Sequence, residues 1–131
     1  MKDQKIPRSL KIWFSIHFVI DIILALPLFF FPQEAMAFFG FTVIDKYMAR
    51  LVAAALAGIG GVSLLSKEKG VESYLSLLNL KIIWSIAAIF GIALTMAQEK
   101  RPVSGWIFGL IFMIFFFVWS YYRSKLSSKK D

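Results

Sequence analysis

Four apolar runs, each close to the length of a membrane-spanning helix, constrain this chain more than any other feature of its sequence. They cover residues 12–31, 46–65, 73–97 and 104–122 of 131 residues. A helix needs about 20 apolar residues to cross a bilayer. Hydrophobic residues make up 59% of the chain, and its mean hydropathy of +0.71 is far above that of a soluble domain. The sequence therefore predicts an all-α integral membrane four-helix bundle, a single transmembrane domain over residues 1–131.

The distribution of Lys and Arg predicts the orientation of the chain. Ten of the fifteen lie in the N-terminal flank, in the loop at residues 67–69 and in the tail at residues 123–131, whereas four lie in the other flanks. Because Lys and Arg are enriched on the cytoplasmic side, both termini are expected to face the cytoplasm across the inner membrane. The tail is expected to be disordered. Membrane orientation explains the net charge of +7, so no nucleic-acid partner is expected.

A cleaved signal peptide is the alternative interpretation of the first run. A basic start, an apolar stretch and Ala35-Met36-Ala37 imitate the three regions of such a peptide. The run exceeds the usual length of about 7–15 apolar residues, and it contains an ionisable pair. A retained span is therefore favoured.

The connection between the first two runs predicts a short helix at the membrane interface. Pro32 suits a helix start and Gly40 a helix stop, and the segment between them is too short to cross a bilayer. An irregular loop is the alternative. Asp45 is the expected N-cap of the second span, because its carboxylate can accept from the free amide donors of the first turn.

Small residues at four-residue spacing predict that the second span is an interior helix. Residues four apart lie on one helical face, and small side chains let helix backbones approach closely in a membrane. The predicted packing residues are Ala49, Ala53, Ala57 and Gly61, with Ala54 and Gly58 in an adjacent row.

Ionisable residues inside the spans are the candidate functional residues, because each costs about 2.5–3.5 kcal/mol at the bilayer centre. His17 and Asp21 are four apart and share a helix face. Lys81, Arg50 or both are expected to reach Asp21 and neutralise its carboxylate, since buried charges are normally paired.

Two interpretations of this predicted cluster remain open. One is a proton or ion relay, or a pocket for an anionic headgroup, with His17 as the titrating member. The other is a structural clasp that joins three helices, with Lys81 partly snorkelling to the interface. A shift of the span boundaries by one turn would instead place His17 or Lys81 near an interface, outside any cluster.

Three further patterns concern the third and fourth spans. Asn79 and Lys81 are two apart and cannot share a face, so Lys81 is expected to point inward with Ser85, and Asn79 to bond another helix or an oligomer contact. Gly105 and Gly109 form a small-xxx-small pair that could mediate homo-oligomerisation. The aromatic residues Trp119, Tyr121 and Tyr122 are expected to form an interfacial belt.

Several kinds of chemistry have no support in the sequence. The chain lacks Cys, which excludes disulfides and thiol chemistry, and a lone His makes a metal site improbable. No catalytic residue and no cofactor are therefore predicted.

The pattern of the first two spans resembles a group of small membrane proteins. The segments LPLFFFP, FFGF and ARLVAAALAGIGG are similar to those of four-span prokaryotic membrane proteins of the DoxX-like group. The resemblance implies a compact four-helix membrane bundle and transfers no catalytic residue.

The predicted function is that of a non-enzymatic accessory protein or a bundle that binds a lipid or another small ligand. The alternative is a small oligomeric transporter or proton-coupled permease that uses the intramembrane cluster. A lipid-modifying enzyme is the third possibility, for which Glu34, Glu72 and Glu99 are too scattered to form a site.

Overall fold

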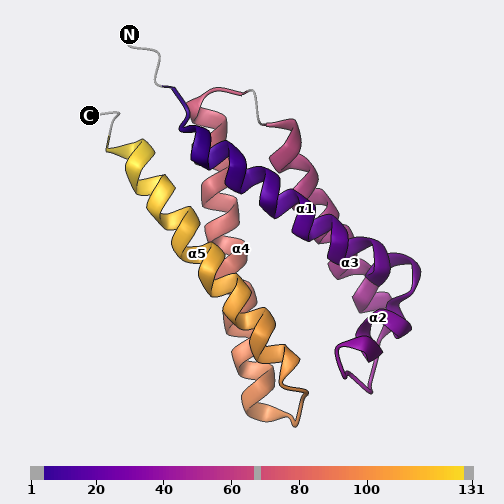
Figure 1. Cartoon of the computed structure of the whole chain (residues 1–131). Helices are drawn as coiled ribbons and strands as arrows, with labels where there is room; N and C mark the ends of the chain where they lie inside the picture. The colour runs from indigo at the N-terminus through magenta and orange to yellow at the C-terminus, as the bar shows by residue number, and fades with distance from the viewer. Residues whose placement is uncertain (1–4, 67–68, 129–131) are drawn as a thin grey trace. The chain divides into compact units, whose positions relative to one another are not determined.

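A computed structural model of the chain describes residues 5–66 and 69–128, and this part of the chain is helical throughout, with short connections. Four long helices and one short helix follow in order (Figure 1). They are α1 (Arg8–Phe30), α2 (Pro32–Phe38), α3 (Lys46–Leu65), α4 (Val71–Gln98) and α5 (Ser104–Ser127). The four long helices have the length and apolar composition needed to cross a membrane. The predicted all-α fold with four spans and an intervening short helix is confirmed.

The chain divides into two compact units, one built from α1, α2 and α3 and the other from α4 and α5. In the first unit α1 and α3 pack against each other as an antiparallel pair, and α2 contacts both (Figure 1). In the second unit α4 and α5 form another antiparallel pair. Closure of the two pairs into one bundle stays a prediction.

The ends of α2 and α3 follow their local sequence. Helix α2 begins at Pro32, whose missing N–H is not needed in a first turn, and the chain leaves it through Gly40 at φ 84°. Asp45 Oδ1 accepts from the backbone N–H groups of Tyr47 and Met48 at 2.9 and 3.1 Å. The predicted short helix and the predicted N-cap are both confirmed.

The buried face of α3 departs from the predicted row of small residues. Ala57 and Gly58 are exposed, and a Cβ added at Gly58 or Gly61 would meet nothing within 4 Å. A step of four residues advances about 40° beyond a full turn, so a strict four-residue row drifts off the contact face. The buried residues alternate steps of four and three instead: Ala49, Ala53, Leu56, Gly60 and Ser63.

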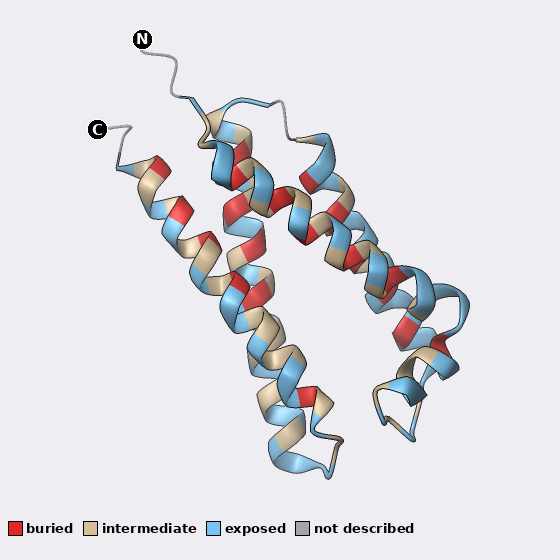
Figure 2. Cartoon of the chain, in the orientation of Figure 1, coloured by how far each residue is buried: buried red, intermediate tan, exposed pale blue. Residues whose placement is uncertain are grey.

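The same alternation appears in the second unit, where the buried positions form stripes (Figure 2). In α4 the stripe consists of Tyr74, Leu78, Lys81 and Ser85, and in α5 it consists of Phe115, Trp119, Tyr122 and Leu126. Alternating steps of three and four keep a contact face aligned along two helices that cross at a shallow angle.

The end of α5 corrects the prediction for the tail. The helix continues from Arg123 to Ser127, where disorder was expected, because Lys and Arg are good helix formers and Leu126 is buried. Residues 129–131 of the predicted tail lie outside the described residues.

Both glycines of the small-xxx-small pair contact α4 of the same chain. A Cβ added at Gly105 would lie 2.6 Å from Met96 Sδ, and one at Gly109 would lie 3.5 Å from Ile92 Cγ2. The small size of Gly105 thus makes room for Met96 of α4, whereas a side chain at Gly109 would meet α4 at an ordinary contact distance. Homo-oligomerisation through this pair stays a prediction.

Replacing Asp45 tests the N-cap of α3. Asp45→Ala removes the oxygen that accepts both hydrogen bonds and is expected to cost about 1 kcal/mol. Asp45→Ser, which keeps a capping oxygen, is expected to retain most of the stability. Thermal unfolding in detergent, followed by far-ultraviolet circular dichroism, measures the difference. Equal stability of the two variants would show that the cap contributes nothing.

Candidate functional site

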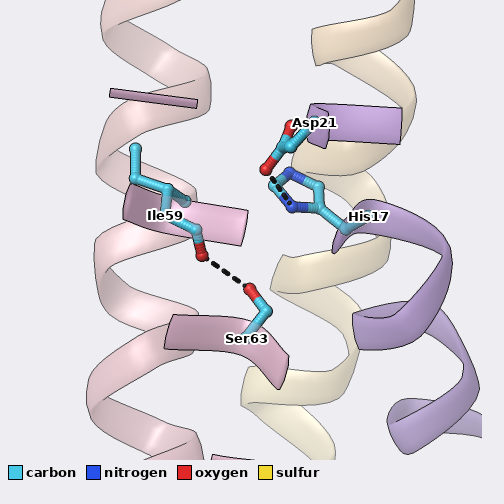
Figure 3. Close-up of polar contacts among 4 residues, drawn as sticks. All are labelled: His17, Asp21, Ile59 and Ser63. Carbon is cyan, nitrogen blue, oxygen red and sulfur yellow. Dashed lines mark hydrogen bonds and ion pairs between the residues drawn. The ribbon is translucent and has the colours of Figure 1, made fainter. Parts of the chain in front are cut away.

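The centre of the α1–α3 pair contains a buried imidazole beside a buried carboxylate. His17 and Asp21 lie one turn apart on the buried face of α1, and they are 3% and 4% exposed. Nδ1 of His17 is 2.9 Å from Oδ2 of Asp21 (Figure 3). The predicted shared face of these two residues therefore brings them into direct contact.

A glycine on α3 makes room for this carboxylate. A Cβ added at Gly60 would lie 2.9 Å from Asp21 Cβ, which is too close for a real side chain, and 3.0 Å from Asp21 Oδ2, which is tighter than most real contacts. The fully buried Ser63 lies one turn further along α3, and its hydroxyl donates to the carbonyl of Ile59 at 2.8 Å (Figure 3). The glycine is therefore what lets α1 and α3 approach around the Asp21 side chain.

The chemistry open to this pair follows from its burial. An isolated charge is costly in a low-dielectric interior, whereas a carboxylate and an imidazole can share one proton and remain neutral as a pair. Such a pair can orient an imidazole, hold a labile proton or fix the register of two helices. Within the described residues no group of three His, Cys, Asp or Glu side chains could hold a metal ion.

Arg50 does not extend to Asp21 but binds the end of α1. Its Nε donates to the backbone carbonyl of Phe29 at 3.1 Å. The last four carbonyls of a helix have no partner within it, and a cation there also complements the helix dipole. The prediction that Arg50 pairs with Asp21 is wrong, because an unsatisfied helix end lies within reach of its side chain.

Lys81 faces an aromatic ring of the neighbouring helix. The residue is 1% exposed, and its Nζ lies 5.1 Å from the centroid of the Trp119 ring. Phe115 stacks on the same ring at 5.5 Å with an interplanar angle of 6°. A cation over the face of Trp is attracted by the ring quadrupole, more strongly where water is excluded. The predicted inward orientation of Lys81 and Ser85 is confirmed.

Trp119 corrects the predicted aromatic belt. Trp119 is 0% and Tyr122 7% exposed, whereas Tyr121 is 58% exposed, so only Tyr121 has the exposure expected of a belt residue. Trp119 belongs to the buried stripe of α5 because it is seven residues from Leu126 and four from Phe115.

Asn79 binds the other helix of its pair. Its Oδ1 accepts from Nε of Arg123 at 2.7 Å, which links α4 to α5 beside the buried stripe. The expectation that Asn79 bonds another helix is confirmed. Asn79 and Lys81 nevertheless both contact α5, Asn79 as an exposed residue and Lys81 as a buried one.

The predicted cluster of polar residues thus divides among several local contacts. His17 and Asp21 stay together, Arg50 lies at the end of α1, and Lys81 and Asn79 contact α5. Pairing between Asp21 and Lys81 stays a prediction, since these residues belong to different units.

A groove follows the outward face of α1. Its volume is about 620 Å³, and its polar lining consists of Arg8, Lys11 and Ser15. The rest of its lining is aliphatic: Ile12, Ile16, Val19 and Ile20. Several of these positions are two residues from the buried stripe of α1, which places them on roughly the opposite side of the helix. The sequence analysis missed this groove, although the basic start of the span was its visible signal.

Comparisons with protein-family models, with curated proteins and with solved structures find no match for this chain. A function therefore has to be argued from the geometry described above.

The Gly60 contact can be tested with neighbouring glycines as controls. Gly60→Ala forces a methyl group against Asp21 and is expected to destabilise the fold by about 1–3 kcal/mol. Gly58→Ala and Gly61→Ala add the same group in open space, and better helix propensity should stabilise them by up to about 1 kcal/mol.

Thermal unfolding in detergent measures all three variants. A Gly60→Ala protein as stable as the Gly58→Ala protein would contradict the close approach of α1 and α3 at Asp21.

Proposed function

We propose that this chain is a non-enzymatic multi-pass protein of the inner membrane, with both termini in the cytoplasm, that binds an anionic phospholipid along α1. The groove on α1 carries this proposal, because it joins two cations to an aliphatic wall. An anionic phospholipid has the complementary shape, with a charged headgroup joined to an acyl chain.

The dimensions of the groove fit one leaflet of a bilayer. Arg8 and Ile20 are twelve residues apart, which corresponds to about 18 Å along a helix. One leaflet contributes about half of the 30 Å hydrocarbon core. A headgroup at Arg8 and Lys11 therefore leaves an acyl chain long enough to follow Ile12, Ile16 and Val19 into the membrane.

The charges at the mouth of the groove also support the proposed orientation. Arg8 and Lys11 belong to the basic N-terminal flank, which the excess of Lys and Arg assigns to the cytoplasmic side. Anionic lipids in that leaflet attract basic residues near a membrane surface, by about 1 kcal/mol for each Lys or Arg.

The contacts of two basic side chains with neighbouring helices support an accessory role rather than catalysis. Lys81 is held against Trp119, and Arg50 occupies the end of α1. Both contacts use the side chain to fix helices, as a structural clasp does.

Lipid retention tests the proposed function. Arg8→Gln/Lys11→Gln removes both cations that would bind the headgroup. This double variant is therefore expected to lose one tightly bound phosphatidylglycerol. Lys69→Gln/Lys125→Gln removes the same charge outside the groove and should retain that lipid. Native mass spectrometry of protein extracted from phosphatidylglycerol vesicles counts the bound lipids, and equal retention by the two double variants would refute the groove.

A proton-coupled permease is the second candidate function, and the buried His17–Asp21 pair favours it. Asp21→Asn separates the two candidates. For a relay, it should abolish a pH-dependent flux in proteoliposomes while the protein stays folded. For a clasp, it should lower the melting temperature in detergent while flux remains at background in both proteins. Asp45→Asn serves as the control, because it alters a carboxylate outside the pair.

A further inference from the structure

A polar pocket on the α4–α5 pair has the lining expected of an oxyanion site. Its volume is about 450 Å³, and Ile82 of α4 forms its apolar wall. The α5 side presents Arg123 and four hydroxyl groups, those of Ser120, Ser124, Ser127 and Ser128. Because the described lining contains a cation and no acidic side chain, the pocket is electrostatically suited to an anion.

Arg123 is held in place at one end of its guanidinium group. Its Nε donates to Asn79 Oδ1 at 2.7 Å, which ties the half-buried side chain to α4. A guanidinium has five N–H donors in a rigid plane, so anchoring Nε orients the donors of both terminal nitrogens. Such a fork matches the spacing of two oxygens of a phosphate group.

The serine hydroxyls add donors around the same space. Serines at positions 120, 124, 127 and 128 are separated by steps of four, three and one, which gathers them on one side of α5. The Ser128 hydroxyl donates to the carbonyl of Lys125 at 3.3 Å, and a hydroxyl can rotate from such a contact toward a ligand oxygen. A phosphate group has enough acceptor oxygens to use Arg123 and several hydroxyls together.

The neighbouring cation on α5, Lys125, contacts Tyr121 and not the pocket. Lys125 Nζ lies 5.5 Å from the centroid of the Tyr121 ring and 3.4 Å from its hydroxyl, and Lys125 does not line the pocket. The positive charge of the pocket therefore comes from Arg123, and Lys125 offers a matched control on the same helix.

We propose that this pocket binds a phosphate group, with Arg123 and the serine hydroxyls as its ligands. The group can belong to a phospholipid headgroup or to a soluble phosphate, since both present the same oxygens. The proposal concerns α4 and α5 and does not depend on lipid binding along α1.

Two measurements on the full chain distinguish the two sources. In nanodiscs of phosphatidylcholine, isothermal titration calorimetry with inorganic phosphate tests a soluble ligand. In nanodiscs that also contain phosphatidate, native mass spectrometry tests a lipid ligand. Each is performed with Arg123→Gln, with Ser124→Ala/Ser127→Ala and with the control Lys125→Gln.

The expected result is saturable binding in at least one of the two measurements. Arg123→Gln should weaken it about ten-fold or more, and the double serine variant several-fold, because each removes hydrogen bonds to a charged group. Lys125→Gln should bind as the unaltered protein does. Because Ala is the best helix former, the double serine variant keeps α5 intact, as circular dichroism will verify.

If inorganic phosphate binds, and Arg123→Gln weakens its binding more than the double serine variant does while Lys125→Gln leaves it unchanged, the pocket is supported as a site for soluble phosphate. If only phosphatidate binds, and the three variants change its binding in the same way, the pocket is supported as a headgroup site. The proposal is overturned if neither probe binds saturably. It is equally overturned if the double serine variant binds as well as the unaltered protein, or if Lys125→Gln weakens binding as much as Arg123→Gln.

Discussion

Hydrocarbon around the four spans is the constraint on which the rest of the structure depends. A bilayer offers no water to backbone amides, so each apolar run has to satisfy its own hydrogen bonds as a helix. Polar side chains face the same constraint and must find partners within the protein. The described polar contacts provide such partners, because each joins a polar side chain to another group of the protein. They are the contacts of His17, Arg50, Asn79 and Lys81.

Close packing of helices in this environment depends on shape rather than on the hydrophobic effect. Lipid tails are as apolar as Leu, so helices gain stability where backbones approach and side chains interdigitate. Gly60 and Gly105 mark two such approaches, one in each unit. At Gly60 the space is filled by Asp21, so the same contact packs two helices and encloses a carboxylate.

Sequence reasoning succeeded where a local rule decides the outcome. Apolar length predicts the spans, and the short-range geometry of Asp45 and Gly40 predicts a cap and a turn. It failed where several partners compete for one side chain. Arg50 can reach a carboxylate or a free carbonyl, and Trp119 suits an interface or a buried cation; only the packing of the pairs decides between them. The face of α3 was mispredicted for another reason, since a four-residue repeat differs from the mean helical step of 3.6 residues.

The charged residues discussed above divide into those buried within a helix pair and those that line a hollow. Lys81 is buried against an indole, and the His17–Asp21 pair is enclosed by α3, so neither presents an open charge to a ligand. Arg8 and Lys11 at the start of α1, and Arg123 toward the end of α5, instead line measurable hollows. The two proposed ligand sites therefore rest on charges near the ends of the described helices, and not on the charges buried within the two helix pairs.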